Sequence, residues 1–324
     1  MRIGRRVMVF VRYLMGAGVI MLVFDACILP YRFCFVVKYA AETKMHQVNN
    51  KRIFCFWEPP ERMPAYLKLC MRTWQKNFPD YEIVLLDYSN IEEWLPPEVL
   101  DVAWVKRYGI AAQTDAFRVA LMAHHGGIWF DVDTIVTTSR AHELLDGVDK
   151  LTMFGDHMGC LSSPASDPFA KMWHECIKRR IERHKWYRAT RPWWIQGWQF
   201  VRRAHRFGPG PVLFRRWDYM GNAAPRNISV RNGDLFHKID RVAVKVLPEV
   251  LVFPPPKFDG RAAYLKYYFD PQYADQLVTD SMSGGGLVML HNGWTPKEVK
   301  KMSEREFLDT GFPMARLLSR ILEQ

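Results

Sequence analysis

Residues 113–133, with the sequence QTDAFRVALMAHHGGIWFDVD, constrain the fold more than any other part of the chain. The first half predicts a buried helix, because apolar residues cover most of its surface. Asp115 and Arg118 are three residues apart, which places them on one face of this helix. Gly126 and Gly127 supply the positive φ angles that end a helix. The apolar residues that follow them are typical of a short strand.

Two carboxylates come directly after this strand. Asp131 and Asp133 are two residues apart, so both project to one side while Val132 points the other way. Their charges repel each other and lose hydration, and a hard divalent cation with oxygen ligands compensates both effects. The alternative is a pair of turn or capping aspartates beside an ordinary buried ion pair of Asp115 and Arg118. The linked pattern as a whole favours a metal site over that alternative.

The segments before this motif predict an alternating α/β fold. Residues 52–57 and 82–87 are typical of buried strands, residues 64–77 predict a helix, and a second helix is expected at about residues 97–108. This order predicts a mostly parallel, Rossmann-like central sheet, whose ligands bind beyond the carboxyl ends of the strands. Trp57 and the two aspartates fall at such ends.

The second half of the chain predicts further elements. We expect strands at residues 151–154, 242–247 and 287–290, a turn-rich loop at 159–164, an amphipathic helix at 167–185 and a final helix at about 303–322. Residues 188–198 hold Trp193, Trp194 and Trp198 among arginines and a proline. Two interpretations of this stretch stay equally open, a platform of rings beneath an acceptor sugar and a packed loop.

Charge and cysteine content narrow the range of partners. A formal net charge of +11 suits a negatively charged neighbour such as nucleotide phosphates or anionic lipid. No nucleic-acid-binding motif accompanies it, so nucleic acid is not expected as a partner. The six cysteines show no zinc-site spacing.

Residues 1–50 are expected to form a membrane-associated segment and linker, and residues 51–324 a single domain. Four arginines precede an apolar run, which predicts an N-terminal hydrophobic helix. A signal anchor, a helix lying in the membrane surface and a helix packed on the domain are the alternatives. We expect membrane association with the domain in the cytoplasm; the alternative location is lumenal, behind a type II signal anchor.

The central motif resembles the donor-site signature of glycosyltransferase family 32 and of the related capsular-polysaccharide-synthesis glycosyltransferases. The glucosyltransferase domain of the large clostridial toxins carries a similar arrangement. The matching positions are Asp115, Arg118, Gly126, Gly127, Asp131 and Asp133. The resemblance extends to Phe56-Trp57 at the end of the first strand. It also extends to His291-Asn292-Gly293-Trp294, which is similar to a loop that closes over the donor diphosphate.

This resemblance implies a GT-A fold that binds a nucleotide-sugar. It implies a metal-dependent retaining glycosyltransferase that moves a sugar from a UDP- or GDP-sugar onto a glycan or glycolipid acceptor in surface or capsular polysaccharide synthesis. The implied cofactor is Mn²⁺, or Mg²⁺, and a histidine ligand suits Mn²⁺ better. The alternatives are an inactive sugar-binding or scaffold protein on the same fold and a metal-dependent phosphohydrolase.

The resemblance also implies roles for individual residues. The metal ligands would be Asp133, Asp131 and His291. The catalytic residues would be Asp131, Asp133, Asp115 and Arg118. The nucleotide-sugar-binding residues would be Phe56, Trp57, Asp115, Arg118, Asp131, His291, Asn292 and Trp294. Within this set, Trp57 would lie against the nucleotide base and Trp294 would cover the site.

Overall fold

The computed structural model describes residues 8–15, 18–25, 51–154, 157–190, 220–221, 245–247, 260–283 and 286–324. The chain divides into two compact units, Met1–His46 and Gln47–Gln324. The stretch around Trp193, Trp194 and Trp198 lies outside the described residues, so both interpretations of it stay open.

In the first unit, two strands pair in antiparallel fashion. These are β1 (Met8–Met15) and β2 (Gly18–Asp25). The predicted N-terminal hydrophobic helix is therefore wrong for these residues. Both segments are rich in Val, Ile, Phe and Tyr, which favour strands, and an apolar run by itself does not distinguish a helix from a strand. Across the described part of the chain, no helix is both long enough and apolar enough to cross a membrane.

The second unit contains a six-stranded sheet with the order β4-β3-β5-β8-β7-β9. Its strands are β3 (Arg52–Phe56), β4 (Glu82–Leu86), β5 (Gly127–Phe130), β7 (Thr152–Phe154), β8 (His157–Ser163) and β9 (Lys245–Leu247). β3 runs parallel to β4 and β5, and β7 runs parallel to β9, whereas β8 is antiparallel to β5 and β7. The expected α/β class with a mostly parallel sheet is confirmed, since three of the five strand pairs are parallel.

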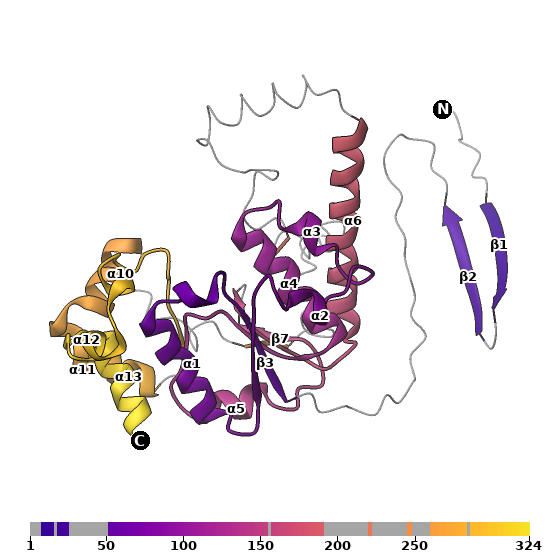
Figure 1. Cartoon of the computed structure of the whole chain (residues 1–324). Helices are drawn as coiled ribbons and strands as arrows, with labels where there is room; N and C mark the ends of the chain where they lie inside the picture. Colours follow the sequence, from indigo (N-terminus) through magenta and orange to yellow (C-terminus); the bar gives the residue numbers. More distant parts are fainter. Residues whose placement is uncertain are drawn as a thin grey trace, which may run out of the picture. The chain divides into compact units, whose positions relative to one another are not determined.

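Helices cover both faces of this sheet (Figure 1). The longer ones are α1 (Ala65–Asn77), α4 (Ile110–His124), α6 (Pro168–Thr190), α10 (Gly260–Phe269), α11 (Ala274–Ser283) and α13 (Pro313–Glu323). The shorter ones are α2 (Ile91–Trp94), α3 (Val102–Val105), α5 (Arg140–Leu145) and α12 (Glu304–Leu308). Among the described residues, turns of 3-10 helix occur at Pro60–Arg62, Pro271–Tyr273 and Val299–Lys301.

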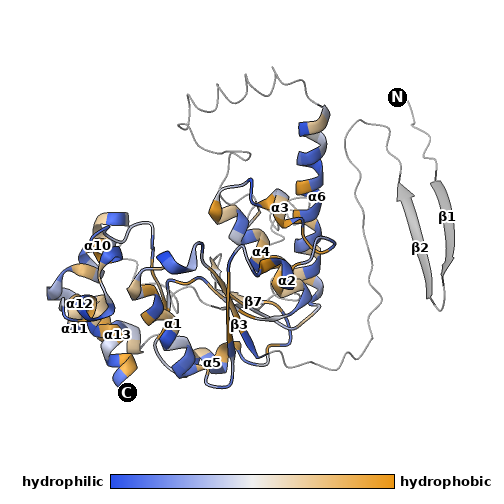
Figure 2. Cartoon of the chain, in the orientation of Figure 1, coloured by the Kyte–Doolittle hydropathy of each residue, from blue (hydrophilic) through white to orange (hydrophobic). Residues whose placement is uncertain are grey.

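The alternation of side chains along β3 explains why two cores form. Ile53 and Cys55 pack into one core with residues of α1 and the C-terminal helices. Phe54 and Phe56 pack into the other core with residues of α4 and α6. Successive strand residues point to opposite faces, so an uninterrupted apolar run is stable only when both faces are covered. Figure 2 shows this as hydrophobic colour along β3 and hydrophilic colour on much of the helices.

A second, two-stranded sheet brings the C-terminal part of the chain to the end of β5. It pairs β6 (Thr134–Val136) with β10 (Leu287–Met289) in antiparallel fashion. β6 begins four residues after β5 ends, so the Asp131–Asp133 segment lies between the two sheets. Residues that follow β10 are thereby placed next to that segment.

Three predicted elements differ from the observed ones. The expected loop at 159–164 is largely strand β8, because pairing with β5 and β7 overrides the weak strand propensity of Gly and Ser. The expected helix at 97–108 is only the short α3. The expected final helix at 303–322 is divided into α12 and α13, because Gly311 has a φ of +68° and Pro313 begins the second helix.

Candidate active site

Helix α4 presents a buried ion pair beside the end of the sheet. Asp115 and Arg118 are each only 5% exposed. The Nη2 atom of Arg118 lies 3.4 Å from Oδ1 of Asp115. Burying either charge alone is costly, so the two side chains stabilise each other in this environment. The predicted neighbourhood of these two residues is confirmed.

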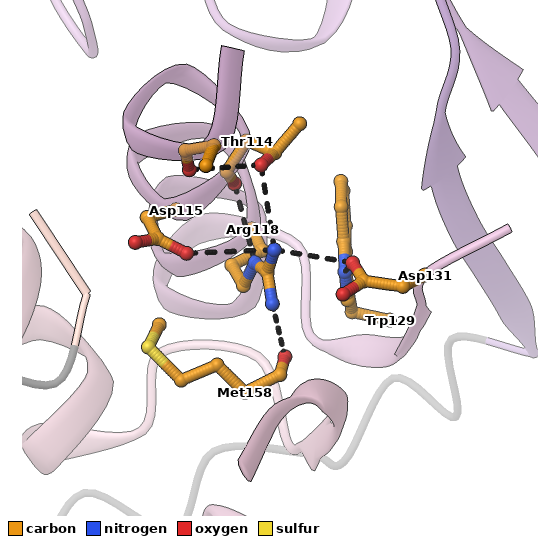
Figure 3. Close-up of polar contacts among 7 residues, drawn as sticks. Thr114, Asp115, Arg118, Trp129, Asp131 and Met158 are labelled. Atoms are coloured by element: carbon orange, nitrogen blue, oxygen red, sulfur yellow. Dashed lines mark hydrogen bonds and ion pairs between the residues drawn. The ribbon is translucent and has the colours of Figure 1, made fainter. Parts of the chain in front are cut away.

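The guanidinium of Arg118 also joins the helix to the end of β5 (Figure 3). Its Nη2 atom lies 3.1 Å from Oδ1 of Asp131, and its Nη1 donates to the carbonyl of Met158 at 2.5 Å. The ring of Trp129 lies 5.3 Å from the guanidinium carbon, within the range of a cation–π contact. The guanidinium of Arg118 therefore links α4, β5 and β8.

Asp131 is held in place by one carboxylate oxygen and by its backbone. Its Oδ1 accepts a hydrogen bond from the indole Nε1 of Trp129 at 2.9 Å, and its backbone N–H donates to the carbonyl of Gly159 at 2.7 Å. No other described residue bonds to Oδ2, and the side chain is 31% exposed. This oxygen is therefore available to a ligand.

Asp133 is bound by the segment after β10. Its Oδ2 accepts from the backbone N–H of Asn292, and its carbonyl accepts from the N–H of Leu290, each at 2.9 Å. Burial, and in second place the negative charge of Asp131, raise the pKa of the Asp133 carboxyl to about 7. Asp133 makes no ion pair with any described residue, so its negative charge is only weakly compensated.

The His291–Trp294 loop is braced by two tyrosines. The hydroxyl of Tyr66 donates to Oδ1 of Asn292 at 2.6 Å, and the hydroxyl of Tyr264 accepts from the N–H of His291 at 3.3 Å. The rings of His291 and Trp294 are 4.3 Å apart and inclined by 36°. The sequence analysis missed both tyrosines, since each is an ordinary apolar-face residue of its helix until the tertiary structure places it.

The three predicted metal ligands are not a preformed three-ligand cluster. Within the described ranges, no group of three or more His, Cys, Asp or Glu side chains is arranged to hold a metal ion. The ring of His291 packs against Trp294 and Tyr264. The structure thus brings Asp133 and the His291 loop together through the backbone of Asn292, not through the imidazole.

The two aromatic residues at the end of β3 have different surroundings. Phe56 is a core residue, with its ring 5.4 Å from Tyr88 and 5.1 Å from Phe117. Trp57 is partly buried, and its backbone N–H donates to the carbonyl of Leu86 at 3.0 Å. Its indole Nε1 is buried without a hydrogen-bond partner among the described residues. Leaving a buried donor unpaired costs free energy. Trp57 lies at the sheet edge where ligands bind, so a ligand there is a candidate partner for this donor.

A further residue was missed by the sequence analysis. A Cβ added to Gly221 would lie 2.3 Å from Oδ2 of Asp115 and 2.8 Å from Sδ of Met158. The backbone at this position thus touches the carboxylate that pairs with Arg118. A lone glycine far along the chain carries no sequence signal for such a contact.

These contacts define a class of protein before any comparison is made. It is an α/β protein in which Asp115, Arg118, Asp131 and Asp133 meet at the carboxyl end of a sheet strand. Sites at this edge commonly bind nucleotides and other phosphates. The arginine supplies a fixed positive charge, and the aspartates supply oxygen ligands.

Comparisons with known proteins give one family match and one distant structural similarity. A family model described as capsular polysaccharide synthesis protein matches residues 30–182, which confirms the resemblance expected from the motif. No curated protein matches. A solved structure described as PaToxG glycosyltransferase is similar at 16% sequence identity and a TM-score of 0.29. The similarity covers 41% of this chain and 62% of that one.

Proposed function

We propose that this chain is a metal-dependent, retaining glycosyltransferase. It would transfer a sugar from a UDP- or GDP-sugar to a glycan or glycolipid acceptor in the synthesis of a surface or capsular polysaccharide. The observation that carries the proposal is the bridge that Arg118 makes between Asp115 and Asp131. This bridge lies within the part of the chain that matches the capsular polysaccharide synthesis family.

The carboxylates fit a hard divalent cation such as Mn²⁺ or Mg²⁺. Asp131 has an oxygen that no described residue occupies, and the pKa of Asp133 is raised by burial and by Asp131. Both observations favour a cation bound by Asp131 and Asp133, with further ligands from phosphate and water. When bound, the ion supplies positive charge that stabilises a departing diphosphate. His291 as a third ligand remains a prediction, and its ring would have to leave Trp294 to serve.

The protein groups around this position suit a nucleotide-sugar. Arg118 provides a positive charge for phosphate, while Asp115 beside it provides an acceptor for sugar hydroxyls. Trp57 would offer the nucleotide an indole face, and its Nε1 donor has no partner among the described residues. Trp294 would exclude water once a donor is bound, since its ring lies beside His291 on the loop that binds Asp133.

The location proposed for the protein is the membrane surface, with the domain on the cytoplasmic side. The support is the arginine-rich start of the chain, whose positive charge suits the anionic lipid of the cytoplasmic leaflet. Protease treatment of intact cells tests the side. A domain that is digested without lysis contradicts the cytoplasmic location.

The deciding experiment is a screen of UDP- and GDP-sugars for hydrolysis by the full chain, with and without Mn²⁺. We expect release of nucleoside diphosphate from one donor, dependent on Mn²⁺ and lowered at least about 100-fold by Asp133→Asn. Asp275→Asn is the matched control, since Asp275 is an exposed acid whose partner is Arg316. Release of inorganic phosphate from simple esters instead would indicate a phosphohydrolase. Full activity of Asp133→Asn would refute the metal role.

A further inference from the structure

Exposed apolar side chains are rare in the described part of the second unit, and two of them lie at one end of the α4–α6 pair. Trp186 on α6 is 63% exposed and Ile110 at the start of α4 is 53% exposed; Met172 is the remaining large one among the described residues. Single exposed apolar side chains are common on protein surfaces, so the charge around these two decides what they can bind.

Contacts between the two helices show that Trp186 and Ile110 belong to the same end. The Tyr108 hydroxyl lies 3.3 Å from Nδ1 of His184, and their rings are 5.9 Å apart. Ile110 follows Tyr108 by two residues, and Trp186 follows His184 by two. At the opposite end of the pair, the histidines 124 and 174 are in contact. The helices are therefore antiparallel, and the last turns of α6 lie near the first turn of α4.

The charge around these two residues is positive. Lys106, Arg107 and Arg183 are all exposed. Along α6, six exposed or partly exposed basic side chains accompany only two acidic ones, and the basic ones are Lys171, Lys178, Arg179, Arg183, Lys185 and Arg188. Lys178 and Lys185 pair with Glu175 and Glu182 at 3.9 Å and 2.7 Å, and Lys185 also pairs with Asp101 at 2.8 Å. The excess positive charge of α6 therefore comes from its other basic side chains. Figure 2 shows α6 as mainly hydrophilic along its length. Trp186 lies in the last two turns of this helix, which ends at Thr190.

We infer that Lys106, Arg107, Ile110, Arg183 and Trp186 form a docking surface for an anionic lipid bilayer. The basic side chains would bind lipid phosphates, and the indole of Trp186 with the side chain of Ile110 would enter the interfacial layer. A protein partner is less well matched, because the surface has few acceptors and its apolar groups are two separate side chains instead of a groove. The inference does not depend on the proposed transfer reaction or on residues 1–50.

The position of this surface gives it a functional consequence. α4 begins at Ile110 and carries Asp115 and Arg118 within its first three turns. A bilayer bound at this end would lie beside the N-terminus of α4, a few residues before Asp115 and Arg118 in the candidate site. If the acceptor is a glycolipid, its head group would then be presented to the site without leaving the membrane.

The test measures binding of the full chain to phosphatidylcholine vesicles with and without about 30% phosphatidylglycerol. We expect partition to anionic vesicles to fall at least about tenfold in Arg107→Glu/Arg183→Glu and several-fold in Trp186→Ala. The control Arg305→Glu/Arg320→Glu makes the same change in charge at two exposed arginines of α12 and α13, and should leave partition unchanged. Donor hydrolysis in solution should be unchanged in all of these variants.

Hydrogen exchange gives a readout that other membrane-binding segments cannot mask. Anionic vesicles should slow exchange in residues 104–111 and 183–190, and neutral vesicles should not. Unchanged exchange in these peptides overturns the inference. Equal partition of Arg107→Glu/Arg183→Glu and Arg305→Glu/Arg320→Glu to anionic vesicles overturns it as well. Slower exchange without vesicles at high protein concentration would assign the surface to a second copy of the chain, and would also overturn it.

Discussion

The guanidinium of Arg118 holds together three parts of the chain: Asp115 on its own helix, Asp131 beyond β5 and the carbonyl of Met158 on β8. Such a buried cation has two roles that ordinary mutagenesis confuses. It stabilises the fold by compensating buried oxygen atoms, and in the proposed reaction it binds phosphate. Separating these roles needs a stability measurement beside each activity measurement.

We predict that Arg118→Ala lowers the free energy of unfolding by about 3–5 kcal/mol, because the buried oxygen of Asp115 loses its charged partner. Arg118→Lys keeps the charge but not the branched set of donors, so it should lose less stability and still lose donor hydrolysis. Urea unfolding measures the first effect. Arg320→Ala is the surface control, and a value for Arg118→Ala equal to it would contradict the prediction.

A second prediction at this scale concerns Gly221. In Gly221→Ala the new Cβ would meet Oδ2 of Asp115 at 2.3 Å, so that the carboxylate must move. If Asp115 binds the donor sugar, a displacement of this size should lower kcat/KM for donor hydrolysis by about 100-fold. Gly109→Ala is the matched control, because a Cβ there meets nothing within 4 Å. Unchanged kcat/KM in Gly221→Ala would remove Asp115 from the site.

At the scale of elements, α4 and α6 meet through a pair of histidines. Nε2 of His124 lies 3.1 Å from Nδ1 of His174, and their rings are 5.0 Å apart. Burial, followed by the charges of His124 and Lys178, lowers the pKa of His174 to about 3. The groups around the pair are His125 on α4 and Lys171, Glu175 and Lys178 on α6.

The sign of the resulting pH dependence follows from this lowered pKa. Below about pH 6.5, the unfolded chain binds a proton at His174 and the folded chain does not. The free energy of unfolding is therefore unaffected by His174 above pH 6.5. It decreases as the pH falls below this value, by about 2 kcal/mol near pH 5. Denaturant unfolding at several pH values should show this loss, and His174→Gln should reduce it. His142→Gln, at a separate site, should keep the full slope.

The elements also show what the sequence alone can and cannot predict. β3 and α1 were predicted nearly to the residue, because alternation and helical spacing are local properties. β8 was expected to be a loop, because its strand character arises only from its neighbours β5 and β7. The first unit contains strands in place of the expected helix for the same reason, since an apolar run fits either structure once paired.

The contacts of the candidate site likewise include some that follow from local sequence spacing and others that depend on tertiary packing. The contact of Asp115 with Arg118 follows from helical spacing. The contact of Arg118 with Asp131 joins residues on different elements, and no pattern in the sequence predicts it. The braces from Tyr66 and Tyr264, and the approach of Gly221, depend on packing between segments far apart in the chain. No local pattern contains such information.

At the scale of the whole molecule, binding of donor and cation should be visible as added stability of the folded state. The weakly compensated charge of Asp133 opposes folding near neutral pH, because its pKa is raised in the folded chain. A bound cation relieves this cost and adds its own binding free energy. A ligand at 100 times its Kd contributes about 2.7 kcal/mol, which raises the Tm of a domain of this size by about 5 °C.

We therefore predict that Mn²⁺ together with UDP or GDP raises the Tm of the full chain by about 5 °C, and that EDTA reverses the rise. Either component alone should have a smaller effect, because the carboxylates and the diphosphate share the ion in the proposed complex. Asp131→Asn and Asp133→Asn should each lose the rise that depends on metal, and Asp275→Asn should keep it. If both variants keep the metal-dependent rise in Tm, the cation binds elsewhere on the molecule. The stabilisation of the leaving diphosphate would then also have to occur away from this edge of the sheet.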